Sequence, residues 1–373
     1  MDGTFAVVIP NFNGEATILQ CLQAIFSSSL LPDEVIVSDD ASTDSSLVLL
    51  SKFYPQIKII RSTQGNTGSS GARNRGQASS EKEFVVFVDV DVQVSKNSFQ
   101  LILEAFQKNP AHHWIVGSFL ATQFTGQLPT HLKTHPVLNS AKDFYSDYKN
   151  IYMSYVFSAL PENIDFIFGS ICAVRGRARY TWPQNQNVTE DTEHGIQATN
   201  KWKQKIYFHQ DLKVNHLKKY TFTSLLKNDF WVPHSWALLF WQHSSPKEAL
   251  IKRRFAHARL WQIFGLAVAA LVLLAPLLLN LASPILSLSL MMVIAASWFG
   301  WNLKFLLHLR KHFSGLTFVK ATAFTLLDQW TMAFGVIVGS LEYLFGKRIS
   351  PAQFTNSAGE LVDESALVSI QTL

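Results

Sequence analysis

Cysteine is almost absent from this sequence. Only Cys21 and Cys172 occur among 373 residues, too few for a disulfide framework, and their spacing matches no metal-binding motif. Cys21 falls on the apolar face of a predicted helix, so we interpret it as a small core residue. The sequence therefore excludes disulfide-stapled scaffolds and cysteine-based zinc modules.

Charge is absent from one long stretch. No charged residue occurs from Leu260 to Leu303. That length accommodates two helices of about 20 residues, each able to cross a hydrocarbon core of roughly 30 Å. Asn280, Ser283 and Pro284 interrupt the stretch and predict a turn. We therefore expect a helical hairpin whose spans cover about 261–280 and 284–308.

A third apolar segment, about 321–345, is interrupted by Asp328. It is typical either of a membrane-crossing helix whose Asp328 faces other helices or of an amphipathic helix in the membrane interface. Gly335 and Gly339 form a GxxxG pair that permits close helix packing. The polar stretch 347–373 has no strong period and is expected to be a flexible tail.

The soluble-looking part of the chain has no basic stripe, which argues against nucleic-acid binding. The basic residues instead flank the apolar run, and the turn within it carries none, as the positive-inside rule requires for a cytoplasmic N-terminal part. No secretory signal opens the chain. We therefore expect an integral protein of the cell inner membrane, with residues 1–240 cytoplasmic and 241–259 forming a basic juxtamembrane segment. The flanking basic residues are Lys247, Lys252, Arg253, Arg254 and Arg259 before the run and Lys304, Arg310, Lys311 and Lys320 after it.

Apolar runs alternate with helical patterns over the first 120 residues. Phe5–Ile9 is continuously apolar, as a buried parallel strand is. Apolar residues then recur at helical spacing from Ile18 to Phe26. The alternation predicts an α/β fold with a mostly parallel sheet, which binds ligands at the carboxyl ends of its strands. Further strands are expected at 34–37, 57–60, 84–88, 115–120, 165–174 and 213–216, and further helices at 45–53, 71–79, 95–107, within 130–160, and at 189–202.

Two acids end the most apolar strand. Phe84–Val88 runs directly into Asp89 and Asp91. Oxygen ligands at one strand end suit Mg²⁺ or Mn²⁺ held against a diphosphate. The alternative is a pair of solvated aspartates without a ligand.

Acids also follow the strand at Glu34–Val37, where Asp39 and Asp40 occur. Asp40 is suited to accept the imide N–H of a uracil ring. The residues after it, 42–44, are typical of helix capping.

A glycine-rich segment runs from Gln64 to Gly76. Its glycines allow the backbone to approach a ligand, and Arg73 with the following helix N-terminus can meet negative charge. Further along, Glu190 and Asp191 form an acidic pair that can supply a general base. The alternatives are a flexible loop for the first segment and an acidic first helical turn for the second.

Taken together, these segments resemble glycosyltransferase family 2, whose members are inverting enzymes of the GT-A fold. The resemblance covers about residues 5–216 and implies that residues 1–240 form the GT-A catalytic domain. Four motifs occur in the family's order. They are Val7-Val-Ile-Pro-Asn-Phe-Asn13 with Asp39-Asp40, the stretch Asn66 to Gly76, the D-x-D pair Asp89 and Asp91, and Thr189-Glu190-Asp191.

The resemblance implies a role for each matched residue. Asp191 is implied as the catalytic base, with Glu190 beside it. A divalent metal, Mn²⁺ or Mg²⁺, is implied at Asp89 and Asp91, with His216 as a third ligand. The implied donor-binding residues are Pro10, Asn13, Asp40, Asn66, Arg73 and Asp89.

The expected function is transfer of a sugar, from a UDP-sugar first of all, to a lipid-linked or other membrane-associated acceptor. Processive members of the family carry Q-x-x-R-W before their membrane helices. This string is absent here, which favours transfer of one or a few sugars. Three alternatives remain: a polyprenyl-phosphate glycosyltransferase with a lipid phosphate acceptor, a nucleotidyltransferase that makes nucleotide sugars, and an inactive membrane scaffold.

Overall fold

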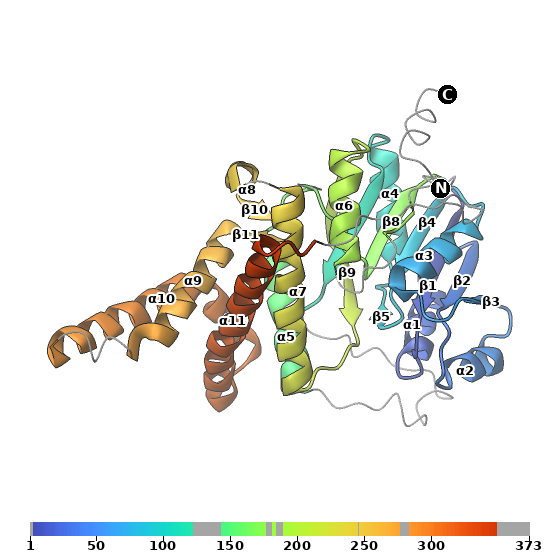
Figure 1. The fold of residues 1–373 in the computed structure, drawn as a ribbon. Helices are drawn as coiled ribbons and strands as arrows, with labels where there is room; N and C mark the ends of the chain where they lie inside the picture. The colour runs from blue at the N-terminus through green and yellow to red at the C-terminus, as the bar shows by residue number, and fades with distance from the viewer. Residues whose placement is uncertain are drawn as a thin grey trace. The chain divides into compact units, whose positions relative to one another are not determined.

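The computed structural model describes residues 3–121, 143–176, 181–183, 189–244, 246–276 and 283–348 (Figure 1). The chain divides into two compact units. The first comprises residues 1–142, 160–218 and 350–373, and the second comprises 143–159 and 219–349.

A mixed sheet forms the centre of the first unit, with the strand order β3-β2-β1-β4-β8-β6-β9-β5, and β7 pairs with β9. The central strand β1 is buried along its whole length, which is why its sequence is continuously apolar. The strands are β1 (Phe5–Asn11), β2 (Glu34–Asp39), β3 (Lys58–Arg61), β4 (Phe84–Val88), β5 (Val92–Gln93), β6 (Trp114–Phe119), β7 (Asn163–Ile164), β8 (Ile171–Arg175) and β9 (Ile206–His216).

The first four strands in sequence are parallel, so β1 lies between β2 and β4. β8 runs antiparallel between β4 and β6. The α/β fold class predicted from the sequence is confirmed, with this antiparallel insertion in a sheet that was expected to be mostly parallel. Because β1, β2 and β4 point the same way, Asn11, Asp39 and the residues after Val88 lie at one edge of the sheet.

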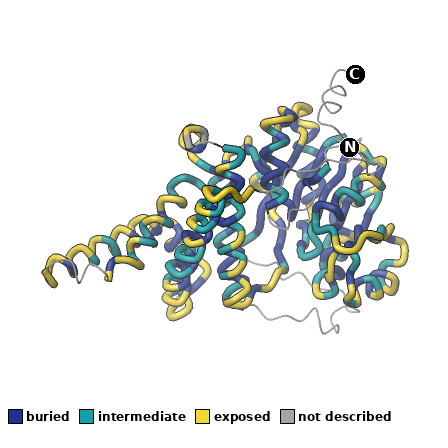
Figure 2. The backbone as a smooth tube through the Cα atoms, viewed as in Figure 1, coloured by how far each residue is buried: buried dark blue, intermediate teal, exposed yellow. Residues whose placement is uncertain are grey.

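Helices cover this sheet, and Figure 2 shows its strands as the most buried part of the first unit. The helices are α1 (Ile18–Phe26), α2 (Ser46–Phe53), α3 (Gly68–Ala78), α4 (Ser98–Lys108) and α6 (Glu190–Asn200). Each was expected from the sequence, within a few residues at its ends.

The second unit is helical apart from a small hairpin of β10 (Arg254–Phe255) and β11 (Ala258–Arg259). Its helices are α5 (Phe144–Phe157), α7 (Phe222–His243), α8 (Pro246–Lys252), α9 (Leu260–Leu274), α10 (Pro284–His312) and α11 (Gly315–Leu344). Of the described residues, α10 and α11 are long and apolar enough to cross a membrane, whereas α9 has 15 residues. Much of α10 is exposed (Figure 2).

The helix α11 is continuous through Asp328. The Asp328 side chain is buried, and the Tyr148 hydroxyl donates to it over 3.4 Å. This corresponds to the alternative in which Asp328 faces other helices. The predicted close packing at the GxxxG pair is also confirmed, because a Cβ on Gly335 or Gly339 would come within 2.3 Å of the carbonyl oxygen of Phe230 or His234 on α7.

One glycine of the first unit has no room for a side chain. A Cβ on Gly195 of α6 would lie 2.3 Å from the Phe166 Cα and 2.4 Å from the Ile167 nitrogen. Backbone atoms cannot rotate away from such a contact, so α6 lies directly against the segment 166–167. This contact fixes the start of α6, where Glu190 and Asp191 lie.

We therefore expect Gly195→Ala to lower the free energy of unfolding by about 1–3 kcal/mol, as overpacked substitutions do. Thermal unfolding of the detergent-solubilised chain, followed by circular dichroism, measures the change. Asn200→Ala, at the exposed end of the same helix, should stay within about 0.5 kcal/mol of the wild type. Equal melting temperatures for the two variants would show that α6 can shift away from the 166–167 backbone.

Candidate active site

Arg73 joins three parts of the candidate site. Its Nη2 lies 2.8 Å from Asp89 Oδ1, and its Nη1 lies 3.0 Å from Glu190 Oε1. Its guanidinium carbon lies 4.6 Å from the centre of a Trp182 ring, an arrangement typical of a cation–π contact. Only 3% of the Arg73 side chain is exposed. Burial alone would lower the pKa of Arg73, but Asp89 and Glu190 outweigh it and raise that pKa above its ordinary value.

Glu190 and Asp191 have different partners although they are adjacent. Glu190 Oε1 also accepts from the Ser69 hydroxyl, over 2.5 Å. Asp191 instead accepts backbone N–H groups, from Gly169 over 2.9 Å and from Thr192 over 2.6 Å. Burial, followed by the nearby Glu190 charge, raises the pKa of Asp191 to about 6. Asp191 is thus the acid suited to exchange a proton near neutral pH.

Asp40 is buried and its carboxylate is fully engaged. It accepts from the Thr67 and Gly68 backbone N–H groups over 2.8 and 2.7 Å and from the Thr67 hydroxyl over 2.7 Å. Arg75 Nη2 lies 2.6 Å from Asp40 Oδ1, the oxygen that also accepts the Thr67 hydroxyl. The carboxylate therefore holds the glycine-rich segment and the start of α3. A uracil contact by Asp40 would have to share these oxygens.

The other predicted donor residues surround this edge of the sheet. Pro10 belongs to β1, where it lies opposite Ser38 of β2 and beyond the last residue that pairs with β4. A missing N–H is tolerated there. Asn13 has a φ of 52° and accepts from the Thr43 backbone N–H over 2.9 Å. Asn66 is exposed and accepts from the Gly68 N–H over 3.0 Å.

Asp89 and Asp91 do not act as a pair in this structure. The chain leaves β4 in a turn, in which the Val92 N–H donates to the Asp89 carbonyl over 3.0 Å. This turn directs Asp89 to Arg73 and Asp91 to His216, whose Nε2 lies 3.5 Å from Asp91 Oδ2. In the described part of the chain, no three His, Cys, Asp or Glu side chains form a group that could hold a metal ion. The predicted trio of Asp89, Asp91 and His216 is therefore not brought together.

Asp91 and His216 nevertheless fit a divalent cation. A carboxylate and an imidazole are acceptable ligands for Mn²⁺, and a cation bound with a nucleotide needs few protein ligands because phosphate oxygens supply the rest. The His216 ring is held by stacking on Phe119, with 4.3 Å between ring centroids. Burial would raise the pKa of Asp91, but the adjacent His216 outweighs it and lowers that pKa.

Several residues of the site were not predicted individually. Ser69 and Arg75 lie in the glycine-rich segment but were not singled out. Trp182 is fully buried and exchanges two hydrogen bonds with Asn74, one at 2.7 Å and one at 3.0 Å. A lone tryptophan outside any periodic segment gives no signal of such a role, whereas the arginine pair around Asn74 could have identified Arg75.

Residues 6–178 match the family described as Glycosyl transferase family 2. This match covers less than half of the chain, and it is to the same family that the four motifs resemble.

Curated relatives match shorter segments. The chain is 29% identical over 101 residues to an uncharacterized glycosyltransferase YibD of Escherichia coli (strain K12), a match covering 26% of this chain and 29% of that protein. It is 33% identical over 91 residues to a poly(ribitol-phosphate) beta-glucosyltransferase of Bacillus spizizenii, covering 23% of this chain and 14% of that protein. The chain therefore spans less than a third of the length of these relatives.

Among solved structures, the mannosyltransferase PcManGT from Pyrobaculum calidifontis, in complex with GDP-Man and Mn²⁺, aligns over 93% of this chain and 89% of its own. The TM-score is 0.47 and the sequence identity is 13%. This similarity is too distant to assign a ligand to the present chain.

Beside the site, α6 contains a second buried acid, Glu193. Its Oε1 accepts from the Gln197 amide over 3.1 Å, and Oε2 has no hydrogen-bond partner among the described residues. Burial raises the pKa of Glu193 to about 7. Between its ordinary pKa of 4.5 and this value, the folded chain keeps a proton that the unfolded chain releases. Folding stability should therefore fall as pH rises through this window.

We expect Glu193→Gln to remove this pH dependence. Between pH 4.5 and 8 the wild type should lose about 3 kcal/mol more unfolding free energy than the variant, in which Asp191 still titrates. Melting temperatures at pH 5 and pH 8 test this, with the exposed Glu162→Gln as the matched control. If Glu193→Gln and Glu162→Gln follow the same pH curve, Glu193 is not the group that loses its proton.

Proposed function

We propose that this chain transfers a sugar, with inversion, from a nucleotide-sugar donor to a membrane-associated acceptor. The observation that carries the proposal is the buried Arg73 cluster, with Asp191 beside it, inside a family 2 domain. A UDP-sugar is the proposed donor, and the absence of a Q-x-x-R-W string supports transfer of one or a few sugars. Two curated relatives are named for sugar transfer to poly(ribitol-phosphate), which supports the reaction type.

The donor is proposed to bind where β1 and β2 end and α3 begins. A diphosphate there meets Arg73, a planar cation with five N–H donors, and the N-terminus of α3. Because Arg73 already contacts two carboxylates, its orientation is fixed before the donor arrives. Such preorganised charge stabilises the leaving diphosphate more than a mobile side chain would.

A divalent cation is proposed to be held by Asp91 and His216 together with donor phosphate oxygens. When bound, it neutralises part of the charge that develops on the leaving diphosphate. Asp89 contacts Arg73 and lies two residues from Asp91, so it links the cation site to the arginine.

Asp191 is proposed as the general base. The acceptor hydroxyl attacks the anomeric carbon, the bond from that carbon to the diphosphate breaks, and the hydroxyl proton passes to Asp191. A pKa of about 6 keeps Asp191 mostly ionised at neutral pH while leaving it basic enough to accept the proton. Glu190, bound to Arg73 and Ser69, is proposed to orient the arginine.

If Asp191 is the base, Asp191→Asn should lower kcat by about 10²–10⁴-fold and leave the donor KM nearly unchanged. The wild-type rate should also rise with pH through about 6, because the base must be ionised, and this limb should vanish in the variant. Release of nucleoside diphosphate by the purified enzyme, measured from pH 5 to 8, tests both effects.

The exposed Glu162→Gln should behave as the wild type in the same assay. An Asp191→Asn variant that turns over within a few-fold of wild type would exclude the base assignment. It would favour a lipid phosphate acceptor, which is already ionised and needs no base.

Asp91→Asn should weaken Mn²⁺ binding in the presence of UDP and raise the metal concentration needed for half-maximal activity. The amide removes the charge of one ligand while keeping its shape. Bound Mn²⁺ counted by electron paramagnetic resonance measures the effect directly. Asp211→Asn, an exposed acid on the same strand as His216, is the matched control. Full activity of Asp91→Asn in excess chelator would rule out a metal at this position.

We propose that the protein is anchored by its apolar C-terminal helices in the cell inner membrane, with the family 2 domain in the cytoplasm. The basic residues that flank the apolar run support this orientation. An impermeant thiol reagent added from outside should label Ala282→Cys and miss Lys82→Cys, both introduced in a chain without its native cysteines. The reverse labelling pattern would overturn the orientation.

A further inference from the structure

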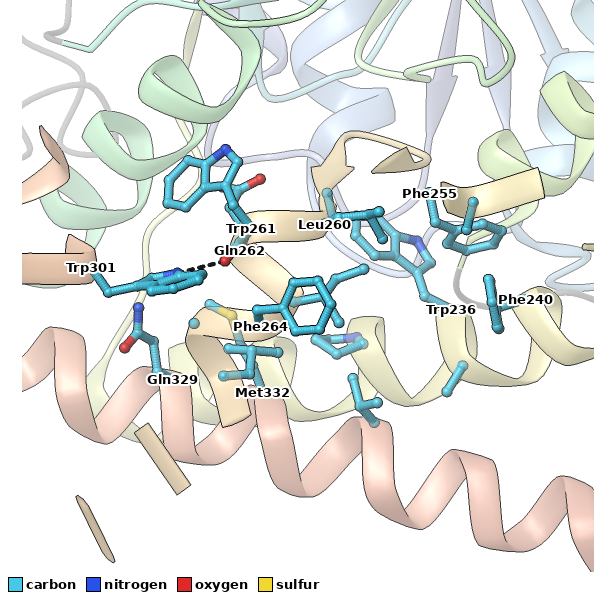
Figure 3. Close-up of a pocket in the computed structure, with 18 of the residues that line it drawn as sticks. Trp236, Phe240, Phe255, Leu260, Trp261, Gln262, Phe264, Trp301, Gln329 and Met332 are labelled. Atoms are coloured by element: carbon cyan, nitrogen blue, oxygen red, sulfur yellow. Dashed lines mark hydrogen bonds between the residues drawn. The ribbon is translucent and has the colours of Figure 1, made fainter. Parts of the chain in front are cut away.

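The second unit contains an apolar groove of about 440 Å³. Figure 3 shows part of its lining, which comes from α5, α7, α8, α9, α10, α11 and the β10–β11 hairpin. Aromatic side chains dominate it, among them Trp236, Phe240, Trp261 and Trp301. The volume falls within the roughly 300–1,000 Å³ typical of small-molecule sites.

Several polar groups in the groove wall already have partners within the wall. The Trp301 indole donates to the Trp261 carbonyl over 2.6 Å, an interaction drawn in Figure 3. The Gln329 amide donates to Asn302 over 2.7 Å, and the Trp241 indole donates to Ser340 over 3.0 Å. A ligand in the groove therefore gains little from polar groups of its own, and an apolar chain fits best.

One wall of the groove is the β10–β11 hairpin, which carries two arginines on its outer face. In the β10–β11 hairpin, Arg254 lies opposite Arg259, and Phe255 lies opposite Ala258. Opposite residues of an antiparallel pair share a face, and successive residues alternate faces. Phe255 and Ala258 line the groove, so the two arginines share the other face of the same hairpin. An apolar channel beside two cations matches a molecule with a long apolar chain and an anionic head.

We propose that the groove binds the hydrocarbon chain of an anionic membrane lipid whose phosphate lies against Arg254 and Arg259. The inference rests on the proposed placement of this unit in a membrane. Tryptophan and tyrosine at the groove are residues that favour the region where chains and headgroups meet. A bound lipid would cover aromatic surface that is otherwise open, such as Trp241 and Trp301, each 41% exposed.

The test uses the full chain in nanodiscs that contain phosphatidylglycerol with a photoreactive acyl chain, and mass spectrometry locates the crosslinks. Val336→Trp fills the groove, whereas Ile337→Trp changes the next residue of α11, which is 50% exposed and does not line it. We expect Val336→Trp to lower crosslinking to α7 and α9 about tenfold, since losing the contact of one or two CH₂ groups already has that effect. Ile337→Trp should leave it unchanged. Ala258→Trp repeats the test from the hairpin if Val336→Trp fails to fold.

The proposed contact between the lipid phosphate and the two hairpin arginines is tested by replacing phosphatidylglycerol with phosphatidylcholine. Arg254→Gln with Arg259→Gln should reduce the preference for the anionic lipid about tenfold. Lys304→Gln with Lys311→Gln removes the same charge from exposed positions of α10 and should not.

Equal crosslinking in Val336→Trp and Ile337→Trp, or crosslinks spread evenly over α10, would indicate bulk lipid and overturn the inference. Protection of the groove by residues 349–373 or by a second copy of the chain would also overturn it. If the protein does not fractionate with membranes at all, the proposed membrane placement fails instead. Loss of sugar transfer with normal crosslinking concerns the proposed function alone.

Discussion

The structure of the candidate site depends on one buried cation. Arg73 ties α3 to Asp89 at the end of β4 and to Glu190 at the start of α6. Removing a guanidinium from water costs several kcal/mol unless its charge is matched. Two carboxylates and the face of Trp182 supply that match. Gly169 leaves the necessary space, because a Cβ there would lie 2.6 Å from Arg73 Nη2. Segments more than a hundred residues apart are thus held by one side chain.

The same cluster explains why two adjacent acids differ. Successive helical residues are turned by about 100°, so Glu190 and Asp191 cannot both face Arg73. Glu190 accepts hydrogen bonds from Arg73 and Ser69, whereas Asp191 accepts them from backbone N–H groups. Burial and then the adjacent Glu190 charge raise the pKa of Asp191 to about 6, and Arg73 offsets only part of this rise. The arrangement that pairs Glu190 with a cation thus leaves its neighbour with a raised pKa.

Much of the first unit could be predicted from the sequence because its strands are continuously apolar and end in polar residues. The strands at 5–11, 34–39 and 84–88 and the helices between them follow from that pattern. The D-x-D geometry did not follow. Spacing two apart places Asp89 and Asp91 on one face only if the strand continues, and here it ends in a turn.

Partners distant in sequence were also beyond prediction. The sequence predicted that Asp40 contacts the uracil ring of the donor. In the structure its hydrogen bonds go to Thr67, Gly68 and Arg75. Its position at the strand end was predictable because it depends on local pattern. Its partners were not, because they depend on which loop the fold brings to that edge.

The second unit shows why composition alone does not divide this chain. The sequence changes character near residue 240, yet α5 and most of α7 precede that point and belong to the same compact unit as the apolar helices. The reason lies in Asp328, since an acid within an apolar helix needs a polar partner. Tyr148 of α5 supplies one, and Lys149 beside it pairs with Asp229 of α7. The glycines of α11 then bring its backbone against α7. The apolar helix α11 thus packs against helices whose mixed composition resembles that of a soluble domain. The expected catalytic region, 1–240, therefore contributes residues to both units.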